Sequence, residues 1–155
     1  MDKANTSRIN PLGGALDGTT TVPGDKSISH RAVLFSAMAQ GTSRLTGVLD
    51  SADVRASIAA GKALGAEVSM ERQIDGSLAG GITGWGEKGP KQPEAPIDCA
   101  NSGTTARLLM GILAPWDIRV EITGDESLIK RPMRRIIAPL MKMGVRFEPD
   151  AKENL

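Results

Sequence analysis

The stretch Val22–Ala32, "VPGDKSISHRA", decides the local architecture at the start of this chain. Its proline-glycine turn leads directly into helical spacing, so we predict a helix over Ser27–Gln40. A helix start carries unpaired N–H groups and the positive end of the helix dipole. Lys26 and Ser27 can add a charge and a hydroxyl to a bound phosphate, and Arg31 follows one turn later on the same face. The pattern predicts an anion site, and an ordinary capped helix with surface cations is the alternative.

This helix is expected to bury one apolar stripe and to stop at a glycine. The stripe consists of Ile28, Ala32, Phe35 and Ala39, which recur at helical spacing. Gly41 follows as the C-terminal stop.

The rest of the chain alternates between strands and helices. We expect an extended strand at 12–22, strands at 42–48, 66–70, 97–99, 118–123 and 145–148, and a strand or hairpin at 74–85. Further helices are expected at 52–64, 102–113 and 132–143, where Ser51 caps the first and Pro132 begins the last. Residues 86–96 contain three prolines and form the predicted linker. This alternation is typical of the α/β class.

Two halves of the sequence share one order of elements. "LGAEV" at 64–68 resembles "MGVRF" at 143–147, and "LFSAMAQG" at 34–41 resembles "LMGILAPW" at 109–116. We interpret this as a duplicated α/β unit, with chance similarity of two α/β patterns as the alternative. The predicted organisation is an N-terminal segment at 1–21, a first unit at 22–86 and a second unit at 95–155. The second unit is incomplete at its C-terminus, which predicts a complementary C-terminal part.

A second candidate site occupies the equivalent place in the second unit. The sequence "DCANSGTTAR" at 98–107 again reads as strand, small-residue turn and helix. Gly103 lets a ligand approach the backbone closely. Asn101 and Thr104 can cap the helix or donate to a ligand, and for Ser102 capping is the better interpretation. Two such helix starts in a repeated unit favour anion binding in one cleft.

A third candidate site lies in "GDESLIKRPM" at 124–133. Arg131 immediately precedes a helix expected to begin at proline. It can therefore project into the same cleft as a clamp for a carboxylate or phosphate. We interpret Asp125 and Glu126 as turn and cap residues rather than a catalytic carboxylate pair.

Composition excludes several classes of protein. The 155 residues are 40% hydrophobic, enough for one core, and the net charge is +1 without a basic stripe, which argues against nucleic-acid binding. No apolar run approaches membrane-spanning length. Cys99 and His30 are each the only residue of their type, so we expect no disulfide and no metal site, and Cys99 has no evident activating neighbour. His30 is expected to be a packed or solvated helix residue. These features favour a cytoplasmic protein.

The three motifs together resemble those of the enolpyruvylshikimate-phosphate (EPSP) synthase family, the 3-phosphoshikimate 1-carboxyvinyltransferases. "VPGDKSISHRA", "NSGTTARLL" and "GDESLIKRPM" occur in the family's order. The resemblance implies the enolpyruvyl transferase fold, an inside-out α/β barrel of repeated βαβαββ units, of which about two are present here. It also implies transfer of the enolpyruvyl group of phosphoenolpyruvate to the 5-hydroxyl of shikimate 3-phosphate, with release of phosphate and without a cofactor. This reaction leads to chorismate and the aromatic amino acids.

The resemblance also implies roles for individual residues. They are Lys26, Ser27 and Arg31 for shikimate 3-phosphate, Lys26, Gly103 and Arg131 for phosphoenolpyruvate, and Asn101 and Thr104 as weaker cleft lining. The herbicide glyphosate would take the phosphoenolpyruvate place as an inhibitor, although the sequence leaves tolerance undecided. No residue is assigned as catalytic, and Lys26 comes nearest, because the family's acid–base carboxylates lie in segments absent here.

The chain alone is therefore expected to bind anions weakly and not to turn over. One alternative is the related enolpyruvyl transferase that acts on UDP-N-acetylglucosamine. That enzyme usually has Lys-Asn in place of Lys26-Ser27, and its reactive cysteine has a context unlike that of Cys99. The other alternative is a non-catalytic anion-binding or complementation fragment.

Overall fold

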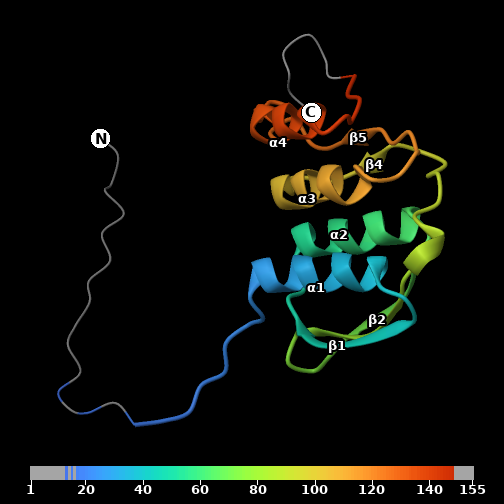
Figure 1. Ribbon diagram of the computed structural model, residues 1–155. Helices are drawn as coiled ribbons and strands as arrows, with labels where there is room; N and C mark the ends of the chain where they lie inside the picture. Colours follow the sequence, from blue (N-terminus) through green and yellow to red (C-terminus); the bar gives the residue numbers. More distant parts are fainter. Residues whose placement is uncertain (1–12, 14, 16, 149–155) are drawn as a thin grey trace, which may run out of the picture.

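A computed structural model of the protein describes residues 13, 15 and 17–148. Its elements are α1 (Lys26–Met38), β1 (Thr42–Val48), α2 (Ala52–Ala63), β2 (Glu67–Arg72), β3 (Leu78–Thr83), a 3₁₀ turn η1 (Gly86–Lys88), β4 (Ile97–Asp98), α3 (Gly103–Leu113), β5 (Ile122–Thr123) and α4 (Arg134–Lys142) (Figure 1). The mixed α/β class predicted from the sequence is confirmed. Within the part that the structure describes, no helix is both long and apolar enough to cross a bilayer.

The first half of the chain is a three-stranded sheet covered by two helices. The strand order is β1-β3-β2, and β3 pairs antiparallel with both neighbours. Leu78 and Ile82 of β3 are buried, and α1 and α2 pack against each other above the sheet (Figure 1). Alternate residues of a strand point to opposite faces, so the spacing of four puts both side chains on the helix-covered face.

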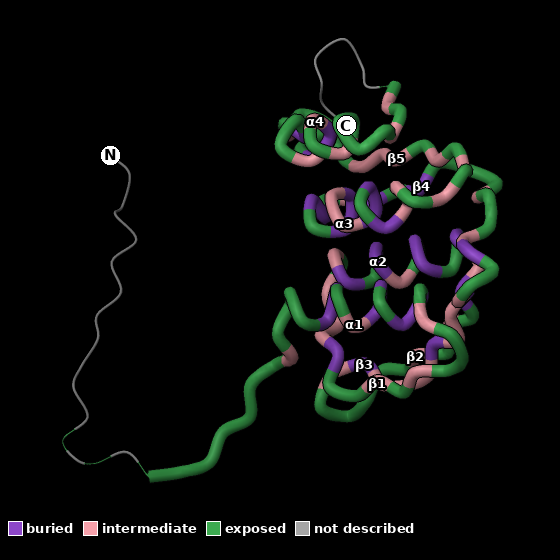
Figure 2. The backbone as a smooth tube through the Cα atoms, viewed as in Figure 1, coloured by how far each residue is buried: buried purple, intermediate pink, exposed green. Residues whose placement is uncertain are grey.

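The second half continues the same stack. β4 and β5 form a short parallel pair, and α3 packs between α2 and α4. One hydrophobic core runs through both halves, from Val33 of α1 through Leu109 of α3 to Ile137 of α4. Figure 2 shows the buried residues concentrated on the facing sides of α1, α2 and α3.

The helices α2 and α4 end in the same way. Gly65 follows α2 with φ 99°, and Gly144 follows α4 with φ 97°, a conformation that favours glycine. In each case the residue after the glycine donates to the carbonyl five residues back, over 3.0 Å at Ala66 and 3.1 Å at Val145. The glycine itself donates to the carbonyl three residues back, over 2.9 Å at Gly65 and 3.0 Å at Gly144, and the two bonds together form a Schellman motif. The two ends lie at the positions where the sequence analysis matched the two halves.

The apolar stripe predicted for α1 is wrong. Ile28 and Phe35 are 68% and 56% exposed, whereas Val33 and Leu34 of the opposite face are buried. The buried face also holds Ser29, which accepts from the backbone N of Leu49, and His30, which contacts Ser57 of α2. Helical spacing therefore located the helix correctly and its buried face incorrectly, because polar side chains mark that face.

Four predicted strand and helix details also differ. The described residues of the segment 12–22 form no strand, and neither do residues 145–148; residues 12, 14 and 16 lie outside the described part. A strand is stable only beside a partner, and no described strand pairs with either segment. The strand expected at 118–123 is reduced to β5. Helix α4 begins at Arg134 after Met133, so Pro132 lies outside the helix rather than at its first position.

Candidate anion-binding site

The start of α1 is fixed by its own cap and by the end of β1. Asp25 is the N-cap, and its side chain accepts from the backbone N of Ile28 over 2.7 Å. Ser29 Oγ accepts from the backbone N of Leu49 over 2.9 Å. A Cβ added to Gly24 would lie 2.1 Å from the carbonyl oxygen of Gly47. The turn predicted from the sequence therefore packs directly on backbone and holds the helix start in place.

Lys26 forms an ion pair with Asp53 of α2. The side chain of Lys26 is 53% exposed and that of Asp53 is 23% exposed, so the ammonium still faces solvent. Ser51 caps α2, as predicted, by accepting from the backbone N of Val54. The cap places Asp53 in the first turn of α2, beside the start of α1. The sequence predicted the cap at Ser51 but not the contact of Asp53 with Lys26.

Ser27 and Arg31 lie on one face of α1, as their spacing predicted. Nη1 of Arg31 donates to the carbonyl oxygen of Ser27 over 3.0 Å, and both residues are exposed. Because neither side chain is packed in the core, both can reach a ligand at the helix start. The hydrogen bond restricts the guanidinium to this turn of the helix.

The start of α3 brings two guanidinium groups together over a glycine. Ser102 caps the helix by accepting from the backbone N of Thr105 over 3.2 Å, which agrees with its predicted capping role. A Cβ added to Gly103 would lie 2.5 Å from Nη1 of Arg107 and 3.1 Å from Nη1 of Arg131. The absence of a side chain at Gly103 is therefore what lets both cations approach the helix start.

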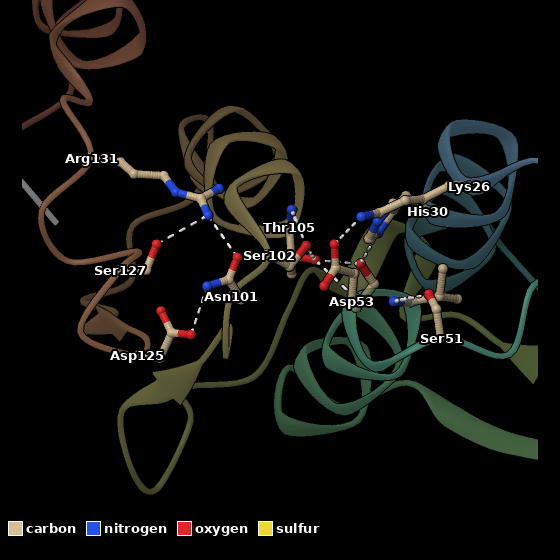
Figure 3. Close-up of polar contacts among 12 residues, drawn as sticks. Lys26, His30, Ser51, Asp53, Asn101, Ser102, Thr105, Asp125, Ser127 and Arg131 are labelled. Atoms are coloured by element: carbon tan, nitrogen blue, oxygen red, sulfur yellow. Dashed lines mark hydrogen bonds and ion pairs between the residues drawn. The ribbon is translucent and has the colours of Figure 1, made fainter. Parts of the chain in front are cut away.

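Arg131 is held from a second side by polar groups. Its Nη2 donates to Oδ1 of Asn101 over 2.6 Å and to Oγ of Ser127 over 3.4 Å. Nδ2 of Asn101 in turn donates to Oδ2 of Asp125 over 2.7 Å (Figure 3). That bond from Asn101 is the main cause that holds the pKa of Asp125 below its ordinary value. Asp125 thus remains an anion that accepts hydrogen bonds.

A buried chain of polar side chains connects helices α1, α2 and α3. His30 Nδ1 contacts Ser57 Oγ, Ser57 Oγ contacts Thr105 Oγ1, and Thr105 Oγ1 contacts Ser102 Oγ, each over 2.7 Å. Thr105 Oγ1 also lies 3.4 Å from the carbonyl oxygen of Asp53, which connects this chain to the partner of Lys26. Figure 3 shows the row from Arg131 through Thr105 and Asp53 to Lys26.

The predicted site residues therefore fall into two neighbouring groups. Lys26, Ser27 and Arg31 surround the start of α1, while Asn101, Gly103 and Arg131 surround the start of α3, where Thr104 lies exposed on the first turn. Sequence reasoning placed Arg107 within the second motif without giving it a role, and it predicted neither the contact of Asp53 with Lys26 nor the buried hydroxyl chain. The spacing of Arg107 four residues after Gly103 was a usable signal, since such pairs share a helix face.

Cys99 and His30, for which the sequence predicted no role as nucleophile or base, are both buried. Burial raises the pKa of the Cys99 thiol to about 12, so the residue stays protonated at neutral pH. His30 is fully buried, and burial is the main cause that lowers its pKa. Its Nε2 has no hydrogen-bond partner among the residues that the structure describes. Over the same residues, no group of three candidate side chains is placed to hold a metal ion.

We expect the burial of His30 to make stability depend on pH. The folded-state pKa lies below the unfolded value of about 6.5, so unfolding takes up a proton in this range. Stability is therefore complete above the unfolded pKa and falls as the pH drops below it. Urea unfolding at about pH 7.5 and 5.5 should give a lower midpoint at the acidic value. His30→Asn should flatten this difference, and an unchanged pH dependence in that variant would contradict the assignment.

The fold and site define the class as an α/β protein with cations gathered at adjacent helix starts, an arrangement that favours small phosphorylated ligands. The family model described as EPSP synthase (3-phosphoshikimate 1-carboxyvinyltransferase) matches residues 12–155, so the chain belongs to the EPSP synthase family.

Individual relatives agree with this family. The chain is 50% identical over 134 residues to a 3-phosphoshikimate 1-carboxyvinyltransferase of Parvibaculum lavamentivorans, covering 86% of this chain and 29% of the relative. It is 44% identical over 154 residues to the one from Xanthomonas campestris, covering 97% of this chain and 34% of the relative. The solved EPSP synthase from Acinetobacter baumannii matches with a TM-score of 0.78 and 41% identity, covering 88% and 30%. The chain thus spans about a third or less of the length of these relatives.

Proposed function

We propose that this chain forms part of the substrate cleft of an enzyme that transfers the enolpyruvyl group of phosphoenolpyruvate to the 5-hydroxyl of shikimate 3-phosphate. The observation that carries the proposal is the convergence of Arg107 and Arg131 over Gly103, beside the helix start that bears Lys26. Membership of the EPSP synthase family supports the same reaction. The product would feed chorismate and aromatic amino acid synthesis in the cytoplasm.

The two helix starts suit the two anionic substrates. We assign the shikimate 3-phosphate side to Lys26, Ser27 and Arg31, whose two cations and one hydroxyl lie at one end of α1. The phosphoenolpyruvate side is assigned to Gly103 and Arg131, with Lys26 reaching both substrates. Asn101 and Thr104 line the cleft, and glyphosate would compete on the phosphoenolpyruvate side.

The proposed chemistry needs preorganised positive charge more than it needs a nucleophile on this chain. Addition of the 5-hydroxyl oxygen to C2 of phosphoenolpyruvate, with a proton added at C3, gives a tetrahedral intermediate. Loss of phosphate from C2 and of a proton from C3 then re-forms the double bond, now as the enol ether of the product. Two anionic substrates repel each other, so fixed cations and helix N–H groups lower the cost of bringing them together. Lys26 would share its ammonium between Asp53 and a substrate oxygen, because the ammonium carries three donors.

We further propose that residues 22–86 and 95–155 are two units of a repeated βαβαββ arrangement. The matched Schellman ends of α2 and α4 support this, because both use the same two backbone bonds around a glycine. The rest of the enzyme would supply the acid–base groups, as further chain or as a separate partner.

An NMR titration tests the proposed function. Shikimate 3-phosphate added to the labelled chain should shift amide signals around Lys26, Ser27 and Arg31. Phosphate release on adding phosphoenolpyruvate should occur only with a chain that supplies the C-terminal part. Lys26→Met should abolish the shifts, whereas Lys142→Met removes the same charge from the exposed end of α4 and should leave them. Absence of shifts in both samples, or product from this chain alone, would contradict the proposal.

A further inference from the structure

We propose that Asp125 is a positioning residue for phosphoenolpyruvate binding, because its carboxylate fixes the amide of Asn101 and the amide in turn fixes the Arg131 guanidinium. The inference rests on the proposed function for the identity of the ligand. Sequence reasoning assigned Asp125 only as a turn or cap residue, and the structure adds a contact to Asn101, which lies just before the N-cap of α3.

Asp125 is itself anchored at three points. Its backbone N donates to the carbonyl oxygen of Ala100 over 2.8 Å. Oδ1 accepts from the backbone N of Leu128 over 2.8 Å, and Leu128 is fully buried. Oδ2 accepts from Nδ2 of Asn101 over 2.7 Å. The carboxylate is therefore fixed between its own loop and the start of α3.

The charge of Asp125 determines which way the amide of Asn101 faces. An ionised carboxylate can only accept hydrogen bonds, whereas an amide has a donor end and an acceptor end. The NH₂ group of Asn101 must therefore face Asp125, and its Oδ1 then faces Arg131. If the amide turned round, its NH₂ group would meet a guanidinium that has only donors.

The fixed amide leaves one edge of the guanidinium for a ligand. Nη2 of Arg131 is occupied by Asn101 and by the more distant Ser127. Nη1 lies on the side of Gly103, 3.1 Å from the position that a Cβ would take there. An arginine presented in this way can bind a carboxylate or phosphate with a defined orientation.

Removing the charge of Asp125 should change the affinity for the anion in opposite directions, depending on whether Asp125 positions Arg131 or only repels the ligand. A carboxylate near an anion site repels the ligand, so removing its charge should strengthen binding. If Asp125 positions Arg131 through Asn101, removing the charge should weaken binding instead. Glu126 supplies the matched control, since it is the next residue, carries the same charge and pairs with Lys130 rather than with Asn101.

The experiment is a phosphoenolpyruvate titration of the labelled chain in the parent and in Asp125→Asn and Glu126→Gln. Asparagine retains an oxygen for the Leu128 backbone, so the turn and the melting temperature should persist. We expect Asp125→Asn to weaken binding on the order of ten-fold and Glu126→Gln to leave it equal or slightly tighter. In a protein that already carries Asn101→Ala, adding Asp125→Asn should cause no further loss of binding. Unchanged or tighter binding in Asp125→Asn would overturn the proposal.

A ligand-free measurement separates this inference from the proposed function. The side-chain Nε–H signal of Arg131 should move or broaden in Asp125→Asn and stay in place in Glu126→Gln. If this change occurs but the parent chain binds no phosphoenolpyruvate, the proposed ligand is wrong and the positioning contact stands. If the signal is unchanged in Asp125→Asn, the positioning contact is wrong whatever the chain binds.

Discussion

Replacing Gly24 by alanine is expected to destabilise the fold by about 3 kcal/mol, since overpacked sites that cannot relax cost this much. The added Cβ would lie 2.1 Å from the carbonyl oxygen of Gly47 and 3.0 Å from the backbone N of Leu49. Both atoms belong to backbone at the end of β1, so no side chain can swing aside. Relief requires that the turn before α1 move away from β1, which also breaks the bond between Leu49 and Ser29.

Urea unfolding of Gly24→Ala and Gly111→Ala measures this effect with a matched control. Gly111 lies within α3, and an added Cβ there would meet nothing within 4 Å. The same substitution should stabilise the protein there by about 0.5–1 kcal/mol, because alanine favours a helix over glycine. Equal unfolding midpoints for Gly24→Ala and the parent would show that the turn is not packed as described.

The sequence predicted the first three helices closely because their ends carry local signals. Ser51 and Ser102 are capping residues that bond within their own first turn, so their effect does not depend on the rest of the fold. Gly65 adopts a positive φ that few other residues tolerate. The buried face of α1 carries no such signal, because His30 and its polar neighbours are buried only through contacts with distant residues.

In the candidate site too, features with a local sequence signal were predicted and contacts between distant residues were not. Lys26, Gly103 and Arg131 were predicted because each lies at a helix start or in a motif readable from neighbouring residues. The ion pair of Lys26 with Asp53 joins two helices across 27 positions of sequence, and no local pattern encodes it. The bond from Asn101 to Asp125 likewise depends on how β4 and β5 pair. Residue types at helix starts were therefore predictable, whereas the contacts that orient them were not.

Replacing Gly103 by alanine is expected to weaken phosphoenolpyruvate binding by a factor on the order of ten to a hundred, because about 1 Å of misplacement can cost this much. The new Cβ would lie 2.5 Å from Nη1 of Arg107 and 3.1 Å from Nη1 of Arg131, so both guanidinium groups must withdraw from the helix start. The clashing atoms are the ends of long side chains, which can move at little cost to folding. Binding should therefore fall while the free energy of unfolding, measured in urea, stays within about 1 kcal/mol of the parent.

Two titrations decide whether this loss is specific to one side of the cleft. Shikimate 3-phosphate shifts at Lys26, Ser27 and Arg31 should persist in Gly103→Ala, since the substitution lies at the start of α3 rather than α1. Gly111→Ala, in the same helix but in open space, should bind both ligands like the parent. If Gly103→Ala binds phosphoenolpyruvate as tightly as the parent, the two guanidinium groups do not form its site. If Gly103→Ala weakens the binding of both ligands, the two helix starts act as one site rather than as two separate halves.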